Sequence, residues 1–260
     1  MNPMVEWIAA HAVLLWALLL MLALFAGDLA WQYNGRWQRR AAESGHASTV
    51  LRWQVGVFLL LALVLFFTAI ALAIFGKHVA TLAGFDASLA ENLRDQMSLP
   101  VLRAVAALTH LGDILWVASV AALVLLALLL RQHWRLALAW AVALFGILPV
   151  NGGLKALFQR VRPLHDHGLI IEPGWSFPSG HAFGAVVFYG MLAYVLLRLS
   201  PRFHRAIIAG TMLLIGVVGI SRILLQVHYF SDVLAGYTAG AAWLVLCIGA
   251  AENMRRRTSP

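Results

Sequence analysis

The sequence predicts an all-α fold, a polytopic transmembrane helix bundle of about seven spans with short amphipathic helices in one outer loop. The composition is the first indication, because 62 % of the 260 residues are hydrophobic and only 12 % are charged. A soluble domain is usually about a quarter charged. The second indication is that the charged residues fall between long apolar runs. The third is that these runs are long enough to cross a bilayer.

Seven stretches contain no Asp, Glu, Lys or Arg and cross, or nearly cross, a bilayer, which takes roughly 17–25 residues. Inside hydrocarbon a segment must pair its own backbone N–H and C=O groups, so each stretch is expected to be a helix. The expected spans are residues 7–27, 53–76, 114–130, 136–154, 182–197, 206–221 and 233–251.

The positions of the cations predict the orientation of these spans. The first cation is Arg36, which follows the first span, so the loop that contains it is expected to be cytoplasmic. With this orientation twelve of the nineteen Lys and Arg residues lie in cytoplasmic segments, as the positive-inside rule predicts. We therefore expect a multi-pass protein of the inner (plasma) membrane with an outer N-terminus and a cytoplasmic C-terminus.

Composition divides the chain into three parts. Residues 1–52 carry the first span and an arginine-rich cytoplasmic loop, residues 53–251 form the transmembrane domain with a core at about 105–250, and residues 252–260 form a basic tail. The net charge of +8 does not indicate nucleic-acid binding, because the cations lie in short loops between apolar runs. The single cysteine, Cys247, excludes a disulfide framework and a cysteine-based metal site.

The longest outer loop, residues 77–113, contains a helical pattern. Apolar residues recur at four-residue spacing from Leu89 to Met97 with charged residues between them, and Asp86 is placed to cap the helix. We expect a short amphipathic helix on the membrane surface and a second one over residues 101–108. Both a lid over a site and a plain surface connector fit this pattern.

Three polar clusters interrupt the apolar runs between Lys155 and Asp232. In the first, Lys155 and Arg162 are seven residues apart, so both point to one side if a helix continues to Arg162. Pro163 discourages the helix from running further. Lys and Arg bind phosphate oxygens, but they also snorkel at the ends of membrane helices, and this cluster alone fits both explanations.

The second cluster is Pro178-Ser179-Gly180-His181, directly ahead of an apolar run. Ser179 is suited to cap the helix, Gly180 lets the backbone approach a ligand, and free N–H groups at a helix start bind anions. An ordinary loop-to-helix junction also explains Pro, Ser and Gly. It explains His181 less well, because a histidine at membrane depth favours a functional role.

The third cluster contains Ser221, Arg222, His228 and Asp232. His228 and Asp232 are four residues apart, so on a helix their side chains are neighbours. A carboxylate bonded to one ring nitrogen fixes the tautomer and leaves the other nitrogen as a nucleophile or base. A surface histidine next to a helix-capping Asp232 is the alternative. All three clusters fall at span ends on one predicted face, which favours a single anion-binding site.

Two predictions concern residues outside the clusters. The spacing of Gly236 and Gly240 is typical of close packing between membrane helices. The loop between the first two clusters carries titratable residues that are expected to be solvated, with a role at the entrance of a site as the alternative. These residues are His165, Asp166, His167 and Glu172.

Together the clusters resemble the signature of the type 2 phosphatidic acid phosphatases, which is Lys-x6-Arg-Pro, Pro-Ser-Gly-His and Ser-Arg-x5-His-x3-Asp. The resemblance covers roughly residues 86–250. The matching residues are Lys155, Arg162, Pro163, Pro178, Ser179, Gly180, His181, Ser221, Arg222, His228 and Asp232.

The resemblance implies a role for each site residue. His228 would attack the phosphorus and form a phosphohistidine, Asp232 would orient His228, and His181 would protonate the leaving oxygen and then activate water. The phosphate oxygens would be held, as charge shifts, by Lys155, Arg162, Ser179, Gly180 and Arg222. The resemblance implies no metal and no other cofactor, and the sequence contains no acidic cluster with metal-ligand spacing.

The sequence therefore predicts an integral-membrane lipid phosphatase with its site on the extracytoplasmic (periplasmic) face. By resemblance, the substrate is undecaprenyl pyrophosphate, phosphatidylglycerol phosphate or phosphatidic acid. The expected partners are this lipid and the bilayer, with no nucleic acid. The alternatives are a lipid phosphotransferase using the same phosphohistidine, for example onto lipid A, and a non-catalytic transporter or scaffold that recognises phosphate. The sequence leaves the oligomeric state open.

Overall fold

The computed structural model describes residues 3–43, 53–76, 80–164 and 168–256, and every regular element within these ranges is a helix. The predictions for residues 165–167, for the end of the arginine-rich loop and for the end of the basic tail lie outside the described residues. The helices are α1 (Pro3–Ala10), α2 (Ala12–Glu43), α3 (Trp53–Phe75), α4 (Ala80–Gln96), α5 (Leu99–Thr109), η1 (His110–Gly112), α6 (Ile114–Leu130), α7 (Trp134–Phe145), α8 (Ile147–Phe158), α9 (Gly180–Leu199), η2 (Pro201–Phe203), α10 (His204–Leu224) and α11 (Phe230–Arg256).

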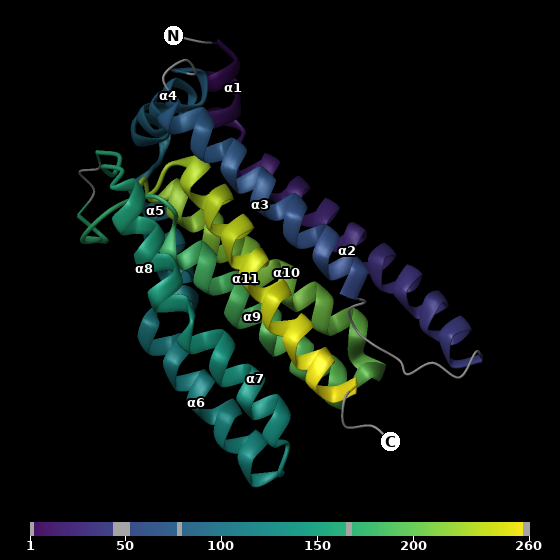
Figure 1. The fold of residues 1–260 in the computed structure, drawn as a ribbon. Helices are drawn as coiled ribbons and strands as arrows, with labels where there is room; N and C mark the ends of the chain where they lie inside the picture. Colours follow the sequence, from purple (N-terminus) through teal and green to yellow (C-terminus); the bar gives the residue numbers. More distant parts are fainter. Residues whose placement is uncertain (1–2, 44–52, 77–79, 165–167, 257–260) are drawn as a thin grey trace.

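The prediction of an all-α transmembrane bundle is confirmed (Figure 1). Among the described residues, six helical stretches are long and apolar enough to cross a membrane, and the number is seven if a bent helix pair at the N-terminus is counted as one span. This pair differs from the straight span expected over residues 7–27, because α1 and the first part of α2 meet at 77°.

The outer loop partly follows its prediction. In α4, Leu89 and Leu93 are buried while Glu91 and Asp95 are exposed, which confirms an amphipathic helix. However, α4 begins at Ala80, so Asp86 lies inside the helix and does not cap it. Its carboxylate points inward and is buried, where it accepts bonds from residues of the site.

The second surface helix, expected over residues 101–108, is instead part of a span. Leu102 and Val105 of α5 are buried against a cluster that includes Leu224 of α10. Through η1 the helix continues toward α6, so that Leu99–Leu130 forms one apolar stretch long enough to cross a membrane. The apolar face of α5 thus finds a protein partner, which removes the reason for it to lie on the membrane surface.

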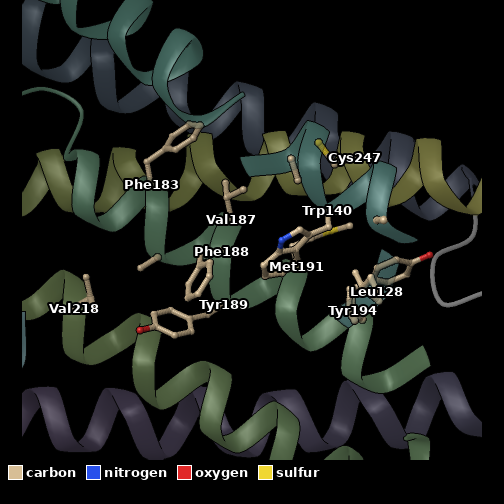
Figure 2. Close-up of a cluster of buried hydrophobic side chains, with 14 residues drawn as sticks. Leu128, Trp140, Phe183, Val187, Phe188, Tyr189, Met191, Tyr194, Val218 and Cys247 are labelled. Carbon is tan, nitrogen blue, oxygen red and sulfur yellow. The ribbon is translucent and has the colours of Figure 1, made fainter. Parts of the chain in front are cut away.

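The buried core is centred on α9, which packs against α7, α10 and α11. A helix that is apolar on all sides is usually buried, and α9 carries buried side chains around its whole circumference. Figure 2 shows Phe183, Phe188, Met191 and Tyr194 of α9 in one cluster with Trp140 of α7. This central helix provides a rigid support for the residues at its N-terminal end.

Glycines bring α11 close to α9, as their spacing predicted. A Cβ added to Gly236 would lie 2.6 Å from the carbonyl oxygen of Ser179, and one added to Gly240 would lie 2.8 Å from that of Phe183. Both distances are shorter than a carbon–oxygen contact tolerates, so only glycine allows this approach. The contact sets the start of α11, with Asp232, beside the start of α9.

Candidate active site

The first cluster follows the end of α8. This helix ends at Phe158, because Gln159 adopts a left-handed conformation with φ 47° and ψ 39°. The helix therefore stops short of Arg162, so the condition under which both cations would share one helical face is not met. They still meet, because Lys155 Nζ and Arg162 Nη2 donate to the same acceptor, the carbonyl oxygen of Trp175, at 2.7 and 3.3 Å.

The second cluster forms the start of α9 as predicted. Ser179 is the N-cap residue, and its Oγ accepts a bond of 3.4 Å from the backbone N–H of Ala182. The backbone N–H of Ser179 donates to the carbonyl oxygen of Asp232 at 2.9 Å. A Cβ on Gly180 would lie 3.9 Å from Cε of Lys155, so this turn lies directly against the first cluster.

The third cluster lies in the turn between α10 and α11. His228 precedes α11 by two residues and is not on a helix, which differs from the expected helical pair. The turn nevertheless brings Nδ1 of His228 to 3.6 Å from Oδ2 of Asp232. The predicted neighbours are therefore neighbours, although a turn and not a helix places them together.

The contacts of His228 define its tautomer. Nη1 of Arg162 lies 3.0 Å from Nε2 of His228. A guanidinium can only donate, so Nε2 is the nitrogen that carries the lone pair. The proton is then on Nδ1, which faces Oγ of Ser176 at 3.3 Å. Nε2 is thus an available nucleophile that points at a cation.

Ser176 links His228 to Asp232 and was not predicted from the sequence. Its hydroxyl donates to Oδ2 of Asp232, and its oxygen is free to accept the proton on Nδ1 of His228. Since Nδ1 and Oδ2 are too far apart for a good direct bond, the hydroxyl completes the connection. Ser176 lies in an irregular loop, where no periodicity marks it.

Burial keeps His228 neutral. The side chain is almost completely buried, and this burial lowers the pKa of His228 to about 4 despite the opposing effect of Asp232. The neighbouring cations Arg162 and Arg222 act in the same direction as burial. An imidazole with this pKa is unprotonated at neutral pH, which is the form that a nucleophile requires.

Arg160 is a second residue that the sequence analysis left unassigned. Its Nη1 donates to Oδ1 of Asp232 at 2.6 Å, and its Nη2 donates to Oδ2 of Asp86 at 2.8 Å. Its guanidinium also lies 4.2 Å from the ring centre of Tyr229. Burial works to lower the pKa of Arg160, but Asp232 and Asp86 outweigh it and raise the pKa. Arg160 therefore ties the outer helix α4 to the carboxylate beside His228.

The buried Arg222 forms an ion pair with the partly buried Glu172. Nη1 of Arg222 donates to Oγ1 of Thr109 at 2.9 Å, and its Nη2 donates to Oε1 of Glu172. Burial works to raise the pKa of Glu172, but Arg222 and other nearby cations hold it below its usual range. Glu172 was expected to be solvated; instead, the buried cation Arg222 draws it into the site.

Glu172 lies at the point where the clusters converge. Its Oε1 is 3.8 Å from Nδ1 of His181, and its charge also interacts with Arg162 and His228. This carboxylate therefore interacts with cations from the first and third clusters. A phosphate group with more negative charge is suited to the same place.

His181 is oriented by Asp113. Its Nε2 lies 3.1 Å from Oδ1 of Asp113, whose other oxygen lies 2.6 Å from Nδ1 of His110. A carboxylate bonded to one ring nitrogen fixes the orientation and tautomer of an imidazole. Asp113 was not predicted, although its position directly ahead of the apolar run of α6 could have marked it.

The predicted site residues therefore meet at one end of the bundle. Glu172 interacts with both histidines and with the three cations Lys155, Arg162 and Arg222, and a group of cations and histidines of this kind is suited to bind an anion. Among the described residues, no group of three or more His, Cys, Asp or Glu side chains is placed to hold a metal ion.

Known proteins share sequence with the segment that carries the three clusters. The family model of the PAP2 superfamily matches residues 134–256, which include all three clusters. Phosphatidylglycerophosphatase B of Bacillus subtilis is 38 % identical over 113 residues, which is 41 % of this chain and only 54 % of that relative. Lipid A 1-phosphatase of Rhizobium johnstonii is 28 % identical over 81 % of this chain and 84 % of its own length.

A solved structure shares the fold. The crystal structure of a transmembrane PAP2-type phosphatidylglycerolphosphate phosphatase from Bacillus subtilis superimposes with a TM-score of 0.68 at 26 % identity. The match covers 78 % of this chain and 98 % of the other. Sequence and fold thus relate the chain to the same group of proteins.

Proposed function

Because the chain belongs to the PAP2 superfamily, we propose that it is a membrane-embedded phosphatase that hydrolyses a lipid phosphate or pyrophosphate through a phosphohistidine on His228. One observation carries this proposal. The lone pair on Nε2 of His228 points at Arg162, at 3.0 Å, among the cations of the site, while Nδ1 faces Ser176, whose hydroxyl bonds to Asp232. A buried neutral imidazole aimed at an anion site is positioned as a nucleophile.

In the first step Nε2 of His228 forms a bond to phosphorus as the bond from phosphorus to the lipid oxygen breaks. His181 donates its proton to that leaving oxygen. Lys155, Arg162 and Arg222 stabilise the charge on the phosphoryl oxygens, together with the hydroxyl of Ser179 and the backbone N–H of Gly180. The imidazolium that forms is stabilised by Asp232 through the hydroxyl of Ser176, which connects Nδ1 to the carboxylate.

In the second step the oxygen of a water molecule forms a bond to phosphorus as the bond from phosphorus to Nε2 of His228 breaks. His181, now neutral, accepts a proton from this water, so each enzyme group returns to its initial state when phosphate leaves. Glu172 must give up its place beside Arg222 for the substrate to bind. No metal or other cofactor takes part in either step, because the three cations supply the charge stabilisation.

The surroundings of the site support a lipid as the substrate. Leu157, Leu164 and Ile171 lie close in sequence to the site residues and are 73 %, 81 % and 85 % exposed. Exposed apolar residues next to an anion site suit a substrate whose phosphate enters the protein while its tail stays in the membrane. The excess of cations at the opposite end of the spans supports an extracytoplasmic site and a cytoplasmic C-terminus.

The relatives narrow the substrates to be tested. Their names point to phosphatidylglycerol phosphate and to the 1-phosphate of lipid A. Undecaprenyl pyrophosphate and phosphatidic acid complete the set.

The test is a panel of these four lipids with purified protein, in which released phosphate is measured with and without EDTA. We expect release from at least one lipid, full activity in EDTA and none in His228→Ala. Phosphate transferred to a second lipid with little release would identify a phosphotransferase. Full activity of His228→Ala would refute the mechanism.

A further inference from the structure

A second basic site lies at the end of the bundle opposite the active site. A cavity of about 210 Å³ is lined there by Arg135, Leu136, Tyr194, Arg198, Ala251 and Arg255. These residues come from the start of α7 and the last turns of α9 and α11. The α9 residues of the cavity, Tyr194 and Arg198, lie 13 and 17 residues after His181, so the two places are about 20–25 Å apart along the helix axis. Figure 1 shows the end of α11 and the α6–α7 connection at the lower end of the bundle.

The cavity carries an excess of positive charge. Its arginines surround one buried carboxylate, that of Glu252, which accepts a bond of 2.7 Å from the hydroxyl of Tyr194. Arg255 lies 3.3 Å and Arg198 lies 4.0 Å from this carboxylate. Two guanidinium groups therefore share a single carboxylate, and Arg135 adds a third charge.

Arg135 distinguishes this cavity from an ordinary buried ion pair. Among the residues that the structure describes, no carboxylate lies within ion-pairing distance of Arg135, and its side chain is exposed at the mouth of the cavity. The positive-inside rule explains a cation in this loop, but it does not explain why three of them line one cavity. Arg131, in the same loop, is exposed and does not line it.

The size and the surroundings indicate the ligand. The volume is below the roughly 300–1,000 Å³ that is typical of pockets for drug-sized ligands, so the cavity suits a small group. Arginine forks match the oxygens of phosphate. Beside the cavity, Trp134 and Leu138 of α7 are exposed apolar side chains, against which acyl chains can lie.

We propose that this cavity binds the phosphate group of an anionic lipid in the leaflet opposite the active site. The bound phosphate contacts Arg135 and the outer edges of Arg198 and Arg255, while Glu252 and Tyr194 hold these two arginines in place. The site is distinct from the phosphatase centre and needs no turnover. It ties the ends of α7, α9 and α11 together.

The test measures lipid-induced stabilisation of the whole purified protein in detergent. Phosphatidylglycerol, a phosphodiester, should raise the Tm of the wild type, and phosphatidylcholine at the same concentration should raise it much less. In Arg135→Ala the apparent affinity for phosphatidylglycerol should fall at least tenfold. In the matched control Arg131→Ala it should change less than twofold. Arg135→Lys should restore part of the effect, and Arg135→Ala should keep its phosphatase activity on a detergent-solubilised substrate.

Three outcomes would overturn the proposal. The first is an equal shift of Tm in Arg135→Ala and the wild type, and the second is an equal response to the two lipids. The third is an equal loss of affinity in Arg131→Ala, which would reduce the effect to general surface charge. The same measurement is made with inorganic phosphate in place of lipid. If inorganic phosphate raised the Tm as strongly, and also through Arg135, the ligand would be free phosphate and the assignment to a lipid would be wrong.

Discussion

Replacing Ser176 by alanine should slow the chemical step without weakening substrate binding. The hydroxyl joins Nδ1 of His228 to Asp232, and these two groups are 3.6 Å apart, so no good direct bond replaces it. A hydrogen bond to a charged group contributes about 1.5–3 kcal/mol. His228 becomes positive only as it attacks phosphorus, so this energy is lost from the transition state. At roughly 1.4 kcal/mol per factor of ten, kcat should fall about 10- to 150-fold.

The assay is steady-state phosphate release, which yields kcat and KM separately. Within the described part of the chain, the side-chain hydrogen bonds of Ser176 go to His228 and Asp232 and not to the three phosphate-binding cations, so KM should stay within about twofold of the wild type. Thr238→Val is the matched control, because it removes a buried hydroxyl of α11 that bonds only to its own helix, at 2.7 Å from the carbonyl oxygen of Leu234. An unchanged kcat in Ser176→Ala, or a loss that lies wholly in KM, would refute this role.

Three further predictions follow from the buried charges. The pKa of His228 is about 4 in the folded protein and 6.5 without burial, so between these pH values the unfolded chain binds a proton that the folded protein does not. The Tm should therefore fall as the pH drops from 6.5 to 4, and it should fall more in the wild type than in His228→Gln. The same dependence of Tm on pH in both proteins would contradict this. Glu172→Gln removes the carboxylate that competes for Arg222, so inorganic phosphate should inhibit about tenfold more strongly, about 1.4 kcal/mol, and weaker inhibition would count against the shared position. Asp86→Asn breaks the buried pair with Arg160 and should cost about 3–5 kcal/mol, seen as a lower Tm in detergent, whereas an unchanged Tm would show that the pair contributes nothing.

The sequence predicted the spans and the positions of the three clusters because both depend on local chemistry. A run of apolar residues must be helical in hydrocarbon, whatever its neighbours are. The polar residues of the clusters are conspicuous because they interrupt such runs. The N-cap at Ser179 followed from the same local reasoning and is present in the structure.

The remaining features depend on contacts that spacing does not encode. Arg160 bonds to Asp86 and to Asp232, which are 74 and 72 residues away, so its part in the site emerges only after folding. The sequence left the end of α8 open, because Gln159 takes a left-handed conformation that is more typical of glycine or asparagine. Glu172 was expected to be solvated because the sequence does not show that Arg222 is buried beside it.

Trapping the covalent intermediate tests the central claim most directly. Purified protein is mixed with a lipid substrate labelled in its terminal phosphate, quenched within one turnover and analysed for labelled protein. We predict label on the imidazole of His228, released by acid, stable to base and absent from His228→Ala. Turnover by the wild type with no labelled protein on this timescale, or label on another residue, would contradict attack by His228.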